Sequence, residues 1–216
     1  MMVPLMVAAP TASKCITDHE VTAFPVSRNL FSSAFQQPEP PLIGDEFKAN
    51  WNQHKWDPNV SHIASGYIYN SPSNQKVRAD VTSDSGFASS LFDYTNISSE
   101  GLVSNTLYNL EPCIAAPPQL WQGYVNPTFP LFSTDILVTS NAVFGGIVDD
   151  QFNGKVASWN IMYGGGIPVT VYLDACNTLV GWDSFINGSR TRIITRFFNI
   201  VIGKLDPKYF CFPMQA

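Results

Sequence analysis

The three histidines, His19, His54 and His62, are the first residues in this chain that could do chemistry. No two of them have the spacing of a metal site, and no G-x-S-x-G sequence supplies a hydrolase nucleophile. The run Gly164–Gly166 lacks the lysine and the strand-to-helix context of a phosphate-binding loop, so it predicts a bend between strands. We therefore expect no enzyme. A hydrolase built from residues far apart in the chain is the least favoured alternative.

The acidic pair Asp149 and Asp150, followed by Asn153, is the one group that could offer oxygen ligands to a cation. Adjacent residues of a strand face opposite sides, so the pair favours a solvated turn over a catalytic dyad. The loop also lacks the number of ligands found in an EF-hand. We expect no cofactor, with calcium as the one candidate and no metal ligands assigned.

The four cysteines are widely spaced and include no C-x-x-C pair, which argues against a zinc site and favours two long-range disulfides. Residues 1–13 are apolar and end in small residues, so residues 1–14 are expected to be a signal-peptide remnant or disordered N-terminus, with cleavage near Ala12 or Ser13. Residues 15–216 are predicted to form a single domain. The cysteines are Cys15, Cys113, Cys176 and Cys211.

Three Asn-X-Ser sequons, at Asn59, Asn96 and Asn187, predict N-glycosylation in an oxidising compartment. Charged residues make up only 13% of the chain against 45% hydrophobic residues, so glycans would supply solubility that charge does not. With a net charge of −5 and no basic cluster, nucleic acid is excluded as a partner. No apolar run reaches the length of roughly 18 residues that a membrane span requires. A secreted or lumenal glycoprotein fits these properties.

Short strands at a regular pace predict an all-β fold without a convincing helix. Lys76–Thr82 alternates most clearly, with Val77, Ala79 and Val81 on one face and polar residues on the other. Local connections between the strands indicate an antiparallel meander large enough to curl or to split into two stacked sheets. The other predicted strands are Ile63–Asn70, Ser89–Thr95, Leu102–Leu110, Asp135–Thr139, Ala142–Val148, Lys155–Tyr163, and a final pair that ends with Thr191–Ile202.

Two segments are not predicted as strands. Cys15–Asp57 shows no sustained period, and its Trp51 and Trp56 are expected to pack an irregular lead-in against the sheet. Ala115–Thr134 carries four prolines among aromatic residues, and it is either a plug over a hydrophobic face or a lid that grips a ligand.

The last long strand, Thr191–Ile202, carries apolar residues on both faces near its end, so it is either part of a filled core or the wall of a pocket. The surplus of aromatic residues on strand faces would suit a curved sheet around an apolar pocket. Strand parity makes seven aromatic residues candidates for the pocket wall, with core packing as the alternative for each. They are Tyr67, Tyr69, Phe92, Tyr94, Trp159, Phe197 and Phe198.

A set of short motifs runs in order from Asn59 to Pro213. They are Ser65–Tyr67 leading into Lys76–Asp80, Leu91–Tyr94, Asn105–Tyr108 before Cys113, Trp121–Gly123, Phe197–Asn199, and Leu205–Pro213. In this order and spacing they resemble the ependymin-related family. The chain departs from the family pattern because it ends in Met214-Gln215-Ala216 and has four cysteines where many members have six.

The resemblance implies a fold of two stacked curved antiparallel sheets, a half-barrel like that of the LolA-type carriers, with an apolar pocket. It also implies a secreted or lysosomal glycoprotein, often dimeric, in some members calcium-binding, whose partner is a lipid or another hydrophobic molecule. By analogy, Cys15 would pair with Cys176 and Cys113 with Cys211. Non-enzymatic binding of a hydrophobic ligand is therefore the expected function, and a matrix or adhesion glycoprotein with a filled core is the alternative.

Overall fold

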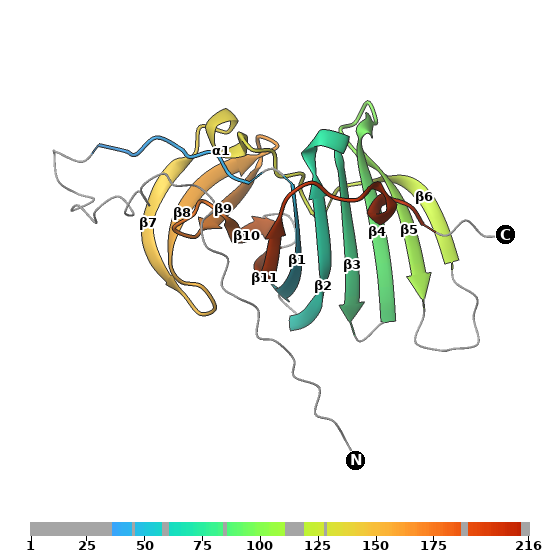
Figure 1. The fold of residues 1–216 in the computed structure, drawn as a ribbon. Coiled ribbons are helices and arrows are strands. Elements are labelled where there is room, and N and C mark those ends of the chain that lie inside the picture. Colours follow the sequence, from blue (N-terminus) through green and yellow to red (C-terminus); the bar gives the residue numbers. More distant parts are fainter. Residues whose placement is uncertain are drawn as a thin grey trace, which may run out of the picture.

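The computed structural model describes residues 36–44, 46–57, 61–83, 86–110, 119–127, 129–186 and 190–212. Within these residues, eleven strands form one antiparallel sheet in the order β6-β5-β4-β3-β2-β1-β11-β10-β9-β8-β7 (Figure 1). The strands are β1 Phe47–Trp56, β2 Ser61–Ser71, β3 Lys76–Ser83, β4 Gly86–Ile97, β5 Val103–Leu110, β6 Gln119–Val125, β7 Val143–Asp150, β8 Gly154–Tyr163, β9 Ile167–Leu173, β10 Leu179–Ile186 and β11 Thr191–Ile202. Three short helices accompany them: η1 Pro72–Asn74, α1 Ile136–Thr139 and η2 Pro207–Phe210.

The sheet consists of two meanders, β1 to β6 and β7 to β11, joined where β1 pairs with β11. The predicted all-β class is confirmed, and hydrogen bonding unites the expected two sheets into a single open one. Because β6 and β7 are consecutive in the chain but lie at opposite edges, the segment between them must cross the whole sheet (Figure 1). We call this segment, residues 126–142, the connector; its residue 128 lies outside the described residues.

One face of the sheet is concave. Tyr94 on β4 and Tyr163 on β8 lie within hydrogen-bonding reach of each other although six strands separate β4 from β8. In a flat sheet they would be about 34 Å apart, at about 4.8 Å per strand. The sheet therefore curls into a half-barrel around the face that carries these two tyrosines, which we call the inner face; the opposite face is the outer face.

The alternation of β3 is confirmed. Val77 and Ala79 are fully buried on the inner face, next to Ile68 of β2. The outer face of β3 was expected to be exposed to solvent, but residues 203–212, which we call the C-terminal segment, cover it: Asp80 is buried, and Arg78 donates to the carbonyl of Tyr209 at 2.9 Å. A regular polar alternation is thus compatible with partial burial when a later segment satisfies the polar groups.

Three strands were missed, and one was misassigned. The final pair was expected to have one strand before Thr191, but that segment contains two, β9 and β10. The expected irregular lead-in contains β1, which lies at the centre of the sheet although six of its ten residues are Asn, Gln, His or Lys. The edge strand β6 lies within the proline-rich segment that was expected to be a loop. Asp135–Thr139, expected to be a strand, instead holds the single-turn helix α1.

The double-sided apolar pattern of β11 has a local cause. Asn199 has φ 52°, in the left-handed region, at a bulge opposite Lys48–Asn50 of β1. A bulge inserts one residue and reverses the side on which later side chains lie. Phe197 is therefore buried on the inner face and Ile200 packs against the same core, whereas Val201 is exposed.

The C-terminal segment is fastened to the outer face through the buried Glu46. The Glu46 carboxylate accepts hydrogen bonds from Ser71, Ser73 and the backbone N–H of Leu205. Burial alone would raise the pKa of Glu46, but these hydrogen bonds and the charge of Lys204 hold it below its ordinary value of 4.5.

Aromatic contacts extend this attachment. Tyr209 stacks on Tyr69 of β2 with ring centroids 4.7 Å apart, and Phe212 stacks on Tyr108 of β5. We expected a disulfide through Cys211 here, paired with Cys113. That pairing is wrong, because Cys211 is an exposed free thiol.

We predict that Glu46→Gln lowers the free energy of unfolding at pH 7 by about 1–3 kcal/mol, because it removes a charged acceptor of three hydrogen bonds, two of them buried. The contribution of a depressed pKa is fully present above the unfolded-state value and is lost as the pH falls through the folded-state value. The difference between variant and wild type should therefore shrink below pH 4.5. Urea unfolding of both proteins between pH 7 and pH 3, followed by tryptophan fluorescence, tests this. A difference that is constant with pH contradicts it.

Candidate functional site

The connector covers the inner face of the half-barrel and fills its centre. Phe129, Phe132 and Leu137 are almost completely buried. The Phe129 ring lies 4.9 Å from Trp51 of β1 and 5.8 Å from Trp182 of β10, so it bridges the two meanders. Of the two alternatives for the proline-rich segment, plug and lid, the residues from 129 onward form a plug.

Side chains, rather than a strand ladder, hold the connector in place. Asn70 of β2 donates from Nδ2 to the carbonyl of Phe132 at 2.9 Å and accepts from the Phe132 N–H through Oδ1 at 3.0 Å. The hydroxyl of Tyr94 donates to the carbonyl of Phe129 at 2.8 Å. Among the described residues, no main-chain hydrogen bond joins the connector to a strand; its Thr134 carbonyl accepts from Ile43, which precedes β1.

Four of the seven predicted wall residues do line the inner face. Phe92, Trp159 and Phe197 are buried there, and Tyr94 packs against the same core. Strand register brings Phe197 next to Trp51, while Trp159 pairs with Val171 of β9. The structure thus brings together aromatic residues from both meanders beneath the connector.

The other three, Tyr67, Tyr69 and Phe198, lie on the outer face, so their assignment to the pocket wall is corrected. Tyr67 is paired with Asp80, whose side chain faces outward, and Tyr69 stacks on the C-terminal segment. In β2 the inner face is taken by small or aliphatic residues such as Ile68. Period-two parity fixes the face of a strand only when its buried partner is known, and aromatic type alone does not reveal it.

Sequence reasoning also missed several inner-face residues. Trp182 is surrounded by Phe129, Phe132 and Phe197, and Asn70 is fully buried. The indole N–H groups of Trp51 and Trp159 are buried without a hydrogen-bond partner among the described residues. A polar residue at the inner-face parity of a strand, as Asn70 is in β2, was the available signal.

The two inner-face tyrosines remain neutral. Burial raises the pKa of Tyr94 far above its ordinary value, and the neighbouring Tyr163 hydroxyl adds to the shift. Burial likewise raises the pKa of Tyr163. Both hydroxyls therefore act as hydrogen-bond donors and acceptors rather than as acids.

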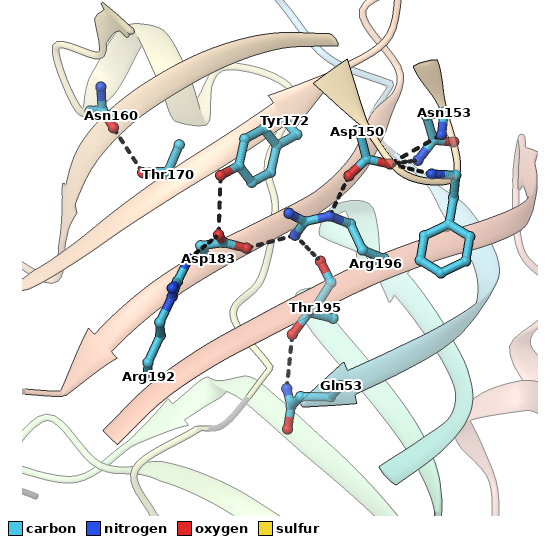
Figure 2. A network of polar contacts seen from close by, with 11 residues as sticks. Gln53, Asp150, Asn153, Asn160, Thr170, Tyr172, Asp183, Arg192, Thr195 and Arg196 are labelled. Atoms are coloured by element: carbon cyan, nitrogen blue, oxygen red, sulfur yellow. Dashed lines mark hydrogen bonds and ion pairs between the residues drawn. The ribbon is translucent and has the colours of Figure 1, made fainter. Parts of the chain in front are cut away.

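On the outer face of the second meander, Arg196 of β11 lies between two carboxylates (Figure 2). It donates to Asp150 of β7 and to Asp183 of β10, each at 2.6 Å, and it lies 4.4 Å from the ring of Tyr172 on β9. The Tyr172 hydroxyl donates to Asp183 at 3.1 Å. Burial opposes the charge of Arg196, but the two carboxylates raise its pKa overall.

The contact with Arg196 also holds Asp150, one member of the acidic pair that was a candidate for cation binding. Burial opposes ionisation of Asp150, but hydrogen bonds from the Phe152 N–H, Arg196 and Asn153 hold its pKa below the ordinary value. Asp149 pairs with Lys155 at 2.9 Å at the exposed end of the β7–β8 hairpin, so both aspartates lie in β7 and the turn that was expected to hold them begins after Asp150. Among the described residues, no three His, Cys, Asp or Glu side chains come together as a metal site.

An open hollow of about 630 Å³ lies on the outer face of β8, β9 and β10. Its lining is mixed: Tyr172, Asp183 and Arg192 lie at one part of it and Met162 and Phe185 at another. Asp183 already pairs with Arg196 and, at 3.7 Å, with the exposed Arg192. Because these lining residues lie on the outer face, the hollow is on the opposite side of the sheet from the expected apolar pocket.

The remaining predicted sites are placed as follows. Cys176 is disulfide-bonded, whereas Cys15 and Cys113 lie outside the described residues, so the Cys15–Cys176 pairing stays a prediction. Asn96 is exposed at the end of β4, where its side chain accepts from the Tyr124 hydroxyl. Asn59 and Asn187, like residues 1–14, lie outside the described residues.

The histidines do not form a site in the described part of the chain. His54 bonds Ser61 at 2.6 Å and lies against the ring of Trp56, and His62 is exposed. His19 lies outside the described residues. Within those residues, no helix has the length and apolar character needed to cross a bilayer.

No protein-family model and no curated protein sequence matches the chain. Among solved structures, it is similar to a LolA superfamily protein from Nitrosomonas europaea, with 10% identity and a TM-score of 0.38 over 81% of this chain and 93% of that one. It is also similar to an uncharacterized conserved protein from Thermus thermophilus, with 12% identity and a TM-score of 0.42 over 80% of this chain and 88% of that one. A DUF1329 family protein from Desulfovibrio piger is similar with 9% identity and a TM-score of 0.38, over 77% of this chain and 90% of that one.

These values are too low to carry an argument about function. They do correct the sequence-based resemblance: the structures that the chain is similar to are described as DUF1329 and LolA superfamily proteins, and no ependymin-related model matches. The assignment to the ependymin-related family is therefore wrong. The short motifs that suggested it are strand and turn sequences of a kind that many β-proteins share.

We predict that Arg196→Met destabilises the protein by about 3–5 kcal/mol, because it leaves two partly buried carboxylates without their cation. Arg192→Met is the matched control. The Arg192 side chain is 61% exposed, and its distance of 3.7 Å from the same Asp183 is longer than the 2.6 Å of Arg196. Its replacement should therefore lower the stability by less than about 1 kcal/mol. Urea denaturation of both variants gives the comparison. Equal losses would show that the Arg196 network is not a structural element.

Proposed function

We propose that this chain is a non-enzymatic carrier that binds a hydrophobic ligand on the inner face of the half-barrel, in the place that the connector occupies. The observation that carries the proposal is the nature of the cover. The apolar face of an open sheet is closed by a single irregular segment, attached through Asn70 and Tyr94 rather than through a strand ladder. Such a segment can leave without disrupting any strand pairing.

The energetics of the closed state favour an apolar ligand. Each fully buried phenylalanine or leucine side chain contributes roughly 1.5–3 kcal/mol to the closed state. Phe129, Phe132 and Leu137 together therefore keep the connector in place unless a ligand covers the same apolar surface. A long acyl chain would do so by packing against Trp51 and Trp182. Small polar molecules would not.

The unpartnered indole groups support the same proposal. The N–H groups of Trp51 and Trp159 are buried donors without an acceptor among the described residues. An unsatisfied buried donor costs free energy, and an oxygen of an amphiphilic ligand would relieve that cost. The disulfide at Cys176 and the exposed sequon at Asn96 support a secreted or lysosomal location for such a carrier.

The experiment that tests the function combines two measurements on the full chain. Protein purified from its natural source is extracted with organic solvent and examined by mass spectrometry for lipid in a stoichiometric amount. The extracted protein is then titrated with the fluorescent probe N-phenyl-1-naphthylamine. Saturable binding that a long-chain lipid displaces supports the carrier. Absence of both co-purified lipid and saturable probe binding would favour the matrix or adhesion alternative with a permanently filled core.

We predict that Tyr94→Phe increases the apparent affinity for the probe about fivefold. The variant removes one hydrogen bond from the closed state, and apparent affinity rises with the fraction of open molecules. Tyr67→Phe is the matched control, because Tyr67 is exposed on the outer face and should leave the affinity unchanged. If the two variants behave alike, connector opening does not limit binding.

A further inference from the structure

The carboxamide of Asn70 forms hydrogen bonds with both backbone polar groups of one residue, Phe132, and this contact suggests which kind of ligand could replace the connector. One carboxamide contacts both the N–H and the carbonyl of the same residue, at 3.0 Å and 2.9 Å. Both groups belong to an NH–Cα–C=O unit in which donor and acceptor point to the same side. A simple ester offers no N–H, and a simple trans amide points its N–H and carbonyl in opposite directions.

The surroundings of this unit are apolar. Asn70 is fully buried on the inner face, between Phe47 of β1 and Val77 of β3 in the strand register. The Phe132 ring packs 5.3 Å from Trp182. The closed site therefore holds one polar NH–Cα–C=O unit next to a large apolar group, in a place where an unsatisfied amide would be costly.

We propose that the ligand of the inner face is an N-acylated amino acid group, whose NH–Cα–C=O unit takes the place of Phe132 against Asn70 and whose acyl chain takes the place of the phenyl rings. This proposal rests on the carrier function above and specifies its ligand class. A purely hydrocarbon ligand would displace the connector but leave the buried donor and acceptor of Asn70 without these two partners. An N-acyl amino acid restores both hydrogen bonds.

The test uses a pair of ligands that differ by one group. N-palmitoylglycinamide carries the NH–Cα–C=O unit, and its ester analogue, with oxygen in place of that N–H, lacks only the donor to Asn70 Oδ1. Both are titrated against the lipid-extracted full chain by displacement of the fluorescent probe. We expect the amide to bind on the order of tenfold more tightly, since the ester cannot donate a hydrogen bond to Asn70 Oδ1 and places an oxygen lone pair there instead.

Asn70→Leu supplies the second readout. The substitution also weakens the attachment of the connector, so both ligands should bind the variant more readily, but the ratio of their affinities should fall to about one. Because the ratio is taken within one protein, a change in connector stability cancels. Should the variant fail to fold, the comparison of the two ligands on the wild-type chain decides the proposal by itself.

The outcomes separate this proposal from the carrier function. If the probe binds and both ligands displace it with equal affinity, the N-acyl amino acid proposal is overturned while the carrier function stands. If neither the probe nor any ligand binds, the carrier function itself fails. A further titration with an N-palmitoylated glycine-rich pentapeptide distinguishes the two sources of the group: weaker binding than N-palmitoylglycinamide indicates a free N-acyl amino acid, and equal or tighter binding indicates an acylated peptide.

Discussion

The structure depends on one constraint: an open sheet of eleven strands has an apolar inner face that must be covered, and no second sheet covers it within the described part of the chain. Curvature of the sheet encloses part of this face, because it brings Tyr94 and Tyr163 together from strands that a flat sheet would hold far apart. The connector covers the centre of the inner face with Phe129 and Phe132. The position of β6 and β7 at opposite edges requires the chain to cross the sheet between them, and the connector does so over the inner face.

The outer face is organised differently in the two halves. Over the first meander, the C-terminal segment lies on the sheet and is held by Glu46, by Arg78 and by aromatic stacking. Over the second meander, no such segment is described, and Arg196 with its two carboxylates satisfies the buried polar groups. Polar networks on the outer face thus hold the sheet together without using the residues of the inner face.

Much of the strand content could be predicted from sequence, because β3 alternates strictly and the hairpins that follow it are local. The central strand β1 could not, since its polar residues are satisfied only by tertiary contacts, as when Gln53 bonds Thr195 of β11 at 2.9 Å. The face of β11 changes at Asn199, and a one-residue bulge has no periodic signature. For the site, aromatic type identified Phe92 and Trp159 but placed Tyr67 and Tyr69 on the wrong face, because strand parity is relative and only the register defines inside.

Asn70 stabilises the closed state, because its carboxamide satisfies the buried N–H and carbonyl of Phe132. An aliphatic residue of similar volume between Phe47 and Val77 would pack as well but would leave these two backbone groups without the Asn70 side chain as a partner. What the carboxamide adds is specificity: it accepts a segment or a ligand only if that partner presents an N–H and a carbonyl on one side. A cover held by apolar packing alone would yield to any hydrocarbon, whereas one held by Asn70 yields at lower cost to a partner that restores both hydrogen bonds. Under the proposed carrier function, the polar residue at the centre of the apolar face would determine which molecules replace the connector, and the aromatic residues around it would determine how strongly they bind.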